Sequence, residues 1–486
     1  MSHILAFDLG GSSLRLALVA PDGSFSAFSR TPLEITQTGQ GQFEADPAIW
    51  WDAFVNSCGE MAQAGHDFSQ VSAVAGCGFT RSQVFLDGAG SPLRPAITFQ
   101  DARAAATLDT MKSTANTAVR EQLQRLNPFD PLARLLWLKT TEPETWQKLR
   151  SVLEPKDFLN LQLTGHSASD RISQTPMARN LGSDPDDTLA ALGIGADILP
   201  EQKSPFDSVG QVKAGLPFPL SEMANAPVYC GSFDTWSGVL GSGALRQGAA
   251  YSISGTSDVF GVMSDRHTTA EGLLTVEWGP NLWQIGGPSQ GAATRLQWAM
   301  ERFFPGAPRD EVLNAAFART QAAPLFLPYL DGERTPLWDP DLSGAFLGVR
   351  SVHENADFVR GVAEGINYLA REVMDRAEQA CGQPVSHVSF SGGMSGTPAL
   401  CQLKADTLQR PVHVPCNHET GLVGAAHVAR RAMTGNDELP VAFIEYLPDV
   451  STRPYHDQRF AIFRAASEAV TPVSHQLNKI EPTGGA

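Results

Sequence analysis

Alternating apolar and polar positions near the N-terminus predict a small antiparallel sheet. Residues 4–8 form an apolar run, and residues 14–19 alternate at the period of a half-buried strand. A Pro-Asp-Gly turn at residues 21–23 leads toward a third strand at residues 24–30. The chain therefore begins with successive short strands. The first of their turns consists of four small residues, Gly10, Gly11, Ser12 and Ser13.

Longer segments with apolar residues at a 3.6-residue period predict helices. Asp46-Pro47 provides an N-cap acid and a proline at the first helical position, which predicts a helix reaching to about residue 64. A core helix is predicted at residues 354–380. Further helices are predicted at residues 101–112, 131–139, 155–163, 290–304, 395–409, 421–433 and 457–477. Residues 182–226 are rich in Pro and Gly and predict a loop-rich cap on the first domain.

The stretch from Tyr229 to Phe260 contains the same arrangement of strand, small-residue turn and strand as the N-terminus. Two apolar strands flank Gly255, Thr256 and Ser257, as the first strands flank the Gly-Gly-Ser-Ser turn. Two such turns in one chain indicate two domains of the same architecture. A chain of 486 residues also exceeds the size at which a single core stops growing. We therefore predict an N-terminal domain at residues 1–246 and a C-terminal domain at residues 247–486.

The chemistry of these segments favours phosphoryl transfer to an alcohol. Asp234 follows an apolar run in the sequence Gly-Ser-Phe-Asp, and a carboxylate at a strand end can accept a proton from a substrate hydroxyl. A Gly-Thr-Ser turn leaves backbone N–H groups and hydroxyls available for phosphate oxygens. The structural alternative is a turn-capping aspartate followed by an ordinary glycine-rich hairpin.

Composition excludes several other classes of function. A formal net charge of −16 argues against a nucleic-acid partner, and the sequence contains neither a basic amphipathic helix for a membrane surface nor an apolar run of membrane-spanning length. The six cysteines are scattered, and the eleven histidines show no H-x-x-x-H pattern, so a transition-metal site has no support. The chain begins directly with a predicted strand, without a signal-peptide pattern, and we expect a cytoplasmic protein.

Several motifs, in order along almost the whole chain, resemble those of the FGGY carbohydrate kinases, a family within the hexokinase, actin and Hsp70 superfamily. They are D-G-A-G-S-P-L-R-P-A at residues 87–96, E-P-K-D at residues 154–157, L-P-Y-L-D-G-E-R-T-P-L-W-D-P at residues 327–340, S-G-G-M-S at residues 391–395, and E-T-G-L-V-G-A-A at residues 419–426. The resemblance implies an α/β fold of two RNase H-like, actin-like ATPase domains that face each other across a nucleotide and sugar cleft.

The resemblance also implies roles for individual residues. Asp234 would be the catalytic base, and Asp8 and Asp234 would lie at the Mg²⁺ site. ATP would contact three segments, which comprise Gly10, Gly11, Ser12 and Ser13, then Gly255, Thr256 and Ser257, then Gly392, Gly393 and Met394. Substrate contacts are expected from Phe79, Thr80, Arg81, Asp101 and Trp236. For Asp8 and for Gly392-Gly393, the structural alternatives are a turn-capping acid and a helix N-cap turn.

Two departures from the family pattern bear on activity and substrate. Gly11 stands where the first phosphate turn commonly has a threonine, although Ser12 and Ser13 retain hydroxyl donors. The segment at residues 78–82, Gly-Phe-Thr-Arg-Ser, fits neither the xylulose-kinase pattern nor the glycerol-kinase pattern. A structural ion pair is the alternative role for Arg81.

The sequence thus predicts an ATP- and Mg²⁺-dependent kinase of a small sugar or polyol, with a ketopentose such as xylulose as the first candidate. The alternatives are a kinase of glycerol or a four-carbon polyol, and a nucleotide-driven regulatory or binding protein without kinase chemistry. The intact Asp234 favours an enzyme. The expected partner is a small-molecule sugar or polyol, with neither nucleic acid nor membrane, and a homodimer is left open.

Overall fold

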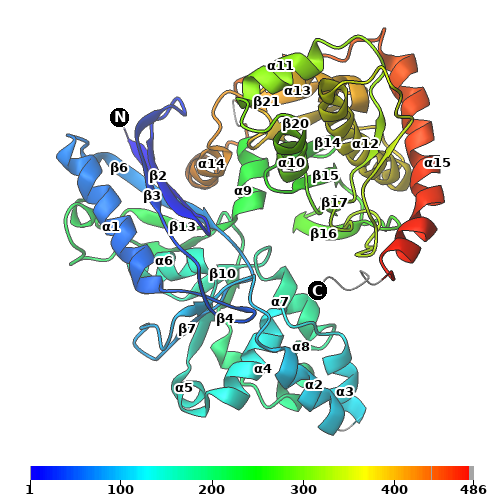
Figure 1. The fold of residues 1–486 in the computed structure, drawn as a ribbon. Helices are drawn as coiled ribbons and strands as arrows, with labels where there is room; N and C mark the ends of the chain where they lie inside the picture. Colours follow the sequence, from blue (N-terminus) through cyan, green and yellow to red (C-terminus); the bar gives the residue numbers. More distant parts are fainter. Residues whose placement is uncertain (1, 116, 439–440, 481–486) are drawn as a thin grey trace. The chain divides into compact units, whose positions relative to one another are not determined.

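The computed structural model describes residues 2–115, 117–438 and 441–480, which form two compact units. Unit 1 comprises Met1–Gly241 together with Glu419–Leu439, and unit 2 comprises Ser242–His418 together with Pro440–Ala486. The chain therefore leaves unit 1 after Gly241 and returns to it for a single helix before ending in unit 2 (Figure 1). The sequence predicts a domain boundary after residue 246, and this boundary stays a prediction.

Unit 1 is built on a six-stranded mixed sheet with the order β12-β13-β6-β1-β2-β3. Its strands are β1 (His3–Leu9), β2 (Ser13–Val19), β3 (Phe25–Pro32), β6 (Val71–Gly78), β12 (Ser208–Gln211) and β13 (Pro227–Phe233). The first three strands are antiparallel, as predicted, and β6 and β13 run parallel to β1. β12 corrects the prediction of a loop-rich cap for residues 182–226, because it joins the main sheet as an edge strand.

Helices cover both faces of this sheet (Figure 1). α1 (Pro47–Gln63) and α6 (Pro155–Thr164) pack on the face that carries Leu5, Phe7 and Leu9, while α14 (Thr420–Thr434) and α9 (Asp234–Gly241) pack on the other face. α1 begins where the sequence predicts it, because the Asp46 carboxylate accepts a hydrogen bond from Ala48 N at 2.9 Å and Pro47 occupies the first turn.

A second hydrophobic cluster in unit 1 lies within a group of short helices and small sheets. The helices are α2 (Ala105–Thr114), α3 (Thr117–Gln124), α4 (Pro131–Thr141), α5 (Pro143–Lys148), α7 (Thr175–Leu181) and α8 (Pro185–Ala191). The strands are β4 (Thr36–Gly39), β5 (Gln42–Ala45), β7 (Val84–Leu86), β8 (Ala96–Ile97), β9 (Ser151–Leu153), β10 (Ala168–Asp170) and β11 (Glu201–Lys203). This region carries the short turn in which Arg81 lies.

Unit 2 repeats the strand plan of unit 1 in a seven-stranded sheet with the order β16-β17-β15-β14-β20-β21-β22. Its strands are β14 (Ala249–Ser254), β15 (Asp258–Ser264), β16 (Leu274–Gly279), β17 (Leu282–Pro288), β20 (His387–Ser391), β21 (Val412–Pro415) and β22 (Phe443–Tyr446). β14 pairs antiparallel with β15 and parallel with β20, as β1 does with β2 and β6. The predicted α/β fold of two similarly built halves is confirmed.

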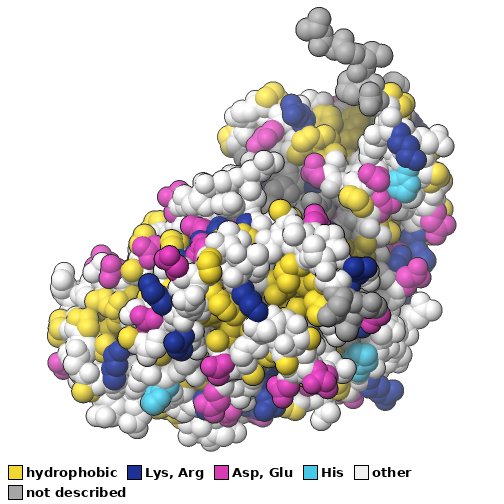
Figure 2. Space-filling view, turned by 90° about the horizontal axis from the view of Figure 1, so that it is seen from below, with side chains coloured by type: hydrophobic (Ala, Val, Ile, Leu, Met, Phe, Trp, Pro, Cys, Tyr) yellow, Lys and Arg dark blue, Asp and Glu magenta, His cyan; other side chains and the backbone are white. Residues whose placement is uncertain are grey.

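The helices of unit 2 are α10 (Ala293–Phe303), α11 (Arg309–Phe317), α12 (Asn355–Cys381), α13 (Pro398–Leu408) and α15 (Arg453–Leu477), and β18 (Leu325–Leu327) with β19 (Ala345–Leu347) forms a small hairpin. α12 buries Val362, Ile366 and Val373, as its apolar period predicts. Among the described residues, no helix has both the length and the apolar character that crossing a bilayer requires. On the face that Figure 2 shows, acidic and basic side chains are interspersed, so charge of one sign does not accumulate there.

Candidate active site

The candidate catalytic residues of unit 1 lie at the carboxyl ends of three parallel strands. Asp8 near the end of β1 is in register with Cys77 of β6, and the end of β6 pairs with Ser232 and Phe233 of β13. Asp234 follows directly as the first residue of α9. Because parallel strands end at the same edge of a sheet, this topology brings the two predicted aspartates together, at the edge where open α/β sheets usually bind ligands.

The buried Asp8 belongs to a partly buried ion-pair network that sequence reasoning did not identify. Arg15 Nη2 lies 2.7 Å from Asp8 Oδ2, and Arg15 Nη1 lies 2.7 Å from Glu419 Oε2. Glu419 directly precedes α14, so one arginine links the start of β2 to the beginning of that helix. A Cβ atom at Gly421 would lie 2.7 Å from Asp8 Oδ2, which allows only a glycine at this close approach.

The surroundings of the Asp8 carboxyl group change its pKa. Burial raises its pKa to about 6, and the neighbouring negative charges of Asp234 and Glu419 act in the same direction, while Arg15 opposes them. Asp8 Oδ1 is buried and accepts no hydrogen bond from any other described residue. An unpartnered buried carboxylate oxygen beside a second carboxylate fits an oxygen-ligated divalent cation.

Asp234 has the environment of a general base. Its Oδ1 accepts hydrogen bonds from Thr235 N at 2.6 Å and Thr235 Oγ1 at 3.2 Å, which fix its rotamer at the start of α9. Burial raises its pKa, and the hydrogen bonds with the positive charges of Arg15 and Arg81 oppose this rise. A carboxylate with a raised pKa is a stronger proton acceptor when it is ionised.

The first glycine turn, Gly10 to Ser13, is tight. Gly10 N donates to Ser13 O at 2.9 Å, and Leu33 N donates to Ser12 O at 2.9 Å. A Cβ atom at Gly11 would lie 3.1 Å from Ile35 Cδ1. The position where the family commonly has a threonine therefore has little space for a side chain in this protein.

Arg81 has a strained backbone and an exposed side chain. Its φ of 57° lies in the left-handed region, which non-glycine residues seldom adopt. The Glu154 carboxyl group accepts hydrogen bonds from Arg81 N and Ser82 N, both at 3.2 Å, and Arg134 Nη1 donates to Arg81 O at 2.5 Å. Thus buried partners hold the main chain of Arg81, while its guanidinium makes no hydrogen bond to another described residue. Strain that the surroundings maintain in this way is typical of functional positions.

The other predicted substrate residues are more enclosed. Phe79 packs edge-on against Trp50, Trp236 is 1% exposed beside Phe206, and Asp101 is fully buried. The Asp101 carboxylate accepts hydrogen bonds from Arg103 and from Phe43 N, and Thr80 Oγ1 donates to Ser173 O at 3.5 Å. Their substrate roles stay predictions, and among the five predicted residues the exposed one is Arg81.

Unit 2 brings two of the predicted nucleotide segments together. Gly392 has a φ of 89°, and a Cβ atom there would lie 2.5 Å from Ser254 O, directly before the turn Gly255 to Ser257. Ser254 Oγ also lies 3.3 Å from Met394 Sδ. Ala292 N and Ala293 N, at the start of α10, donate to Thr256 O and Gly255 O. The carbonyl groups of the turn are thus occupied. Gly255 N donates to Ser257 O at 2.8 Å within the turn, so the N–H groups of Thr256 and Ser257 are the ones that remain for an anion.

A cavity of about 430 Å³ lies beside Ala293, whose N–H donates to Gly255 O of the turn, and its volume is in the range of small-molecule sites. Leu296 and Met300 of α10, Arg309 and Met394 line it, and Arg309 Nη2 donates to Gly393 O at 3.3 Å. The third predicted nucleotide segment therefore borders a half-open cavity with both polar and apolar lining through Met394.

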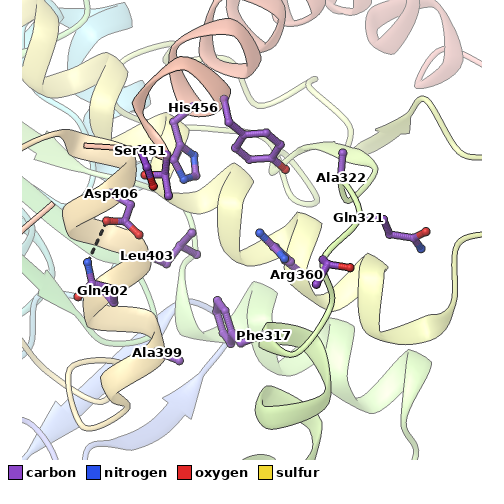
Figure 3. Close-up of a pocket in the computed structure, with 13 residues that line it drawn as sticks. Phe317, Gln321, Ala322, Arg360, Ala399, Gln402, Leu403, Asp406, Ser451 and His456 are labelled. Atoms are coloured by element: carbon purple, nitrogen blue, oxygen red, sulfur yellow. Dashed lines mark hydrogen bonds between the residues drawn. The ribbon is translucent and has the colours of Figure 1, made fainter. Parts of the chain in front are cut away.

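A second pocket, of about 470 Å³, lies beside α13 (Figure 3). Gln402, Leu403 and Asp406 of α13 form one wall, with Arg360 of α12 opposite and His456 of α15 between them. The polar groups hold one another in place: Asp406 Oδ1 accepts from Gln402 Nε2 at 2.9 Å, and His456 Nδ1 lies 3.1 Å from Tyr368 Oη. Burial lowers the pKa of His456 to about 4, so the imidazole is neutral at pH 7.

The grouping of possible metal ligands found among the described residues lies elsewhere, at Asp157, Asp170 and Cys230 of unit 1. The ammonium group of Lys156 already pairs with both carboxylates there, at 2.9 Å from Asp170 Oδ2. This cluster is therefore a buried ion-pair network, and it gives no support to a metal site.

Comparisons with known proteins agree with this geometry. Residues 3–241 match the N-terminal domain, and residues 250–433 the C-terminal domain, of the FGGY family of carbohydrate kinases. The chain is 27% identical to a xylulose kinase of Lactococcus lactis subsp. lactis (strain IL1403), with 100% of both chains covered. The structure of a ligand-bound xylulose kinase from Lactobacillus acidophilus matches with a TM-score of 0.85 at 21% identity, covering 98% of this chain and 100% of that one.

A gluconate kinase from Lactobacillus acidophilus has the same fold, with a TM-score of 0.84 at 21% identity over 98% of this chain and 99% of that one. Kinases named for different sugars thus share this fold, so the fold does not identify the sugar. The family is identified by the two family models, which match both halves of the chain. The chain belongs to the FGGY family of carbohydrate kinases, and it is a phosphotransferase.

Proposed function

We propose that this protein transfers the γ-phosphoryl group of ATP to a hydroxyl group of a ketopentose such as xylulose. The observation that carries the proposal is the placement of Asp8 and Asp234 at the carboxyl ends of β1 and β13, the two parallel strands that flank β6, with Arg15 and the start of α14 beside Asp8. The similarity to proteins named xylulose kinases supports the choice of sugar.

Asp234 acts as the general base in this proposal. As the substrate oxygen forms its bond to the γ-phosphorus of ATP, the hydroxyl proton passes to the Asp234 carboxylate, and the bond to the departing ADP oxygen breaks. The hydrogen bonds from Thr235 keep Oδ1 occupied, so the other carboxylate oxygen, Oδ2, is the one offered to the substrate.

Asp8 and Asp234 are the residues that would hold a divalent cation, for which we propose Mg²⁺. The unpartnered Oδ1 of Asp8 is consistent with this role. When bound, the cation neutralises negative charge on the transferring phosphates. Arg15 keeps Asp8 oriented from the opposite side through Oδ2.

In unit 1, Gly10, Gly11, Ser12 and Ser13 would contact phosphate oxygens. In unit 2, two further segments are proposed nucleotide contacts. The N–H groups of Thr256 and Ser257, with the main chain of Gly255 beside them, would contact phosphate oxygens. The cavity beside Met394 would receive the nucleoside, with the main chain of Gly392 and Gly393 near it. Small residues in these segments permit the close main-chain approach that such contacts need.

Arg81 is our candidate for reading the substrate. Its guanidinium is exposed while its main chain is fixed, and its positive charge opposes the rise that burial causes in the pKa of Asp234. An arginine suits vicinal hydroxyls or a carboxylate. The second candidate substrate is therefore a sugar acid such as gluconate, before glycerol or a four-carbon polyol.

The deciding experiment measures ADP release from ATP with xylulose, gluconate, glycerol and erythritol, each with Mg²⁺ and with excess chelator. We expect Mg²⁺-dependent release that xylulose stimulates most. Hydrolysis that no sugar or polyol stimulates would instead favour the regulatory protein without kinase chemistry. A cytoplasmic location and a homodimeric state remain further parts of the proposal.

A further inference from the structure

Unit 2 contains a buried lysine that the proposed reaction does not yet use. Lys404 on α13 is 1% exposed, and lysines are seldom buried to this degree without a partner. Its Nζ lies 3.0 Å from Ser252 Oγ, 3.4 Å from Asp258 Oδ2 and 4.5 Å from the centroid of the Phe390 ring. All three directions of the ammonium group are therefore occupied by protein.

The partners of Lys404 flank the second phosphate turn on both sides. Ser252 belongs to β14, which enters the turn, and Asp258 is the first residue of β15, which leaves it. Ser252 Oγ donates to Asp258 Oδ1 at 2.7 Å, so the three side chains close a triangle beneath Gly255, Thr256 and Ser257. Asp258 is further fixed through its main chain, because its N–H donates to Ser289 Oγ at 3.0 Å and its carbonyl accepts from Ser289 N at 2.8 Å.

Stability alone is a weak reason for such an arrangement. A buried ion pair costs desolvation energy, and apolar side chains of similar volume often serve a core equally well or better. The pair is instead placed where geometry matters for function. The ion pair joins α13 to Ser252 and Asp258, the residues on either side of the turn. α13 itself begins shortly after the predicted nucleotide segment Gly392 to Met394.

We propose that Lys404 is a positioning residue for phosphoryl transfer, which acts through Asp258 and Ser252 to hold the turn Gly255 to Ser257 in the geometry that ATP phosphates require. The inference rests on the proposed function, because it assumes that this turn contacts phosphates. A displacement of about 1 Å in a positioned group can cost up to about a hundredfold in activity, so a small relaxation of the turn is measurable.

The test separates positioning from folding with three variants: Lys404→Met, Asp258→Asn and the double variant. Each single change leaves an unpaired buried group and should lower the melting temperature. The double variant removes both charges, so it should recover most of that temperature. Its Kd for ADP by calorimetry and its KM for ATP should nevertheless remain about tenfold above the wild-type values, while the KM for the sugar stays unchanged.

Gln402→Met is the matched control, because Gln402 lies on the same helix but bonds to Asp406 and Leu447 at the pocket in Figure 3. It should leave both nucleotide constants unchanged. A double variant with recovered melting temperature and wild-type ADP affinity would overturn the positioning role. A wild-type protein that binds ADP but phosphorylates no sugar would refute the proposed kinase activity alone, and one that binds no ADP would refute both proposals.

Discussion

Glu154 gives a prediction whose sign and size follow directly from its surroundings. Burial raises the pKa of this carboxyl group from 4.5 to about 8, although the N–H groups of Ser82 and Arg81 favour the ionised form. Between these two pH values the folded chain keeps a proton that the unfolded chain has released. The free energy of unfolding therefore decreases as pH rises through this interval, by about 1.4 kcal/mol per pH unit.

The perturbation is Glu154→Gln, which removes the titration. The full interval is worth about 5 kcal/mol. The part between pH 5 and pH 8 is worth about 3–4 kcal/mol, which corresponds to a fall of about 10 °C in the melting temperature of unit 1. The glutamine variant should lack this fall. It should also lose about 1–3 kcal/mol of stability at every pH, because its amide nitrogen cannot accept from one of the two N–H groups.

Scanning calorimetry of both proteins from pH 5 to pH 9 measures the difference directly, since all other titrating groups are shared. Glu144→Gln is the matched control, because Glu144 is an exposed carboxylate in the same unit. If the melting temperatures of wild type and Glu154→Gln run parallel across this range, Glu154 is ionised in the folded protein and the reasoning from burial is wrong.

The remaining predictions concern the candidate active site. Asp234→Asn should lower kcat by about 10²–10⁴-fold with ADP affinity unchanged, and a variant that keeps more than about a tenth of the wild-type turnover would remove Asp234 from the role of base. Arg81→Ala should raise the sugar KM and lower kcat/KM about ten- to a hundredfold with the melting temperature kept, whereas a lower melting temperature with an unaltered sugar KM would make Arg81 structural. Gly421→Ala should displace the Asp8 carboxylate, because its Cβ would lie 2.7 Å from Oδ2, and should lower Mg²⁺-dependent activity; wild-type activity would show that Asp8 can move without cost.

The local part of the site is accessible from the sequence. Asp8, Asp234 and the two small-residue turns each follow an apolar strand, and strand ends are visible as a change of pattern. The partners of these residues are not visible in this way. Glu419 lies 404 positions from Arg15, and a glutamate before a helix suggests an N-cap more readily than an ion pair with a distant strand.

Burial of polar groups is the other property that the pattern conceals. Lys404 lies in a helix, where lysine is usually exposed, yet its ammonium group is buried against Ser252 and Asp258 on either side of the turn Gly255 to Ser257. Asp101 follows a short strand as a ligand-binding acid would, but Arg103 and Phe43 occupy its oxygens. In both cases the neighbours in three dimensions come from other segments of the chain. The local pattern of apolar and polar residues does not identify them.

The return of the chain to unit 1 at α14 has a consequence for how the protein is made. A ribosome has synthesised most of unit 2 before Glu419 and Gly421 emerge, so the first unit cannot be completed in the order in which it is translated. Until then, Arg15 lacks its second carboxylate, and the sheet face that Leu422, Ala425 and Val428 will cover stays open. Unit 1, which is encoded first and contains the candidate residues Asp8 and Asp234, is therefore completed late. We expect a nascent chain that stalls before α14 to present an apolar sheet surface to chaperones and proteases.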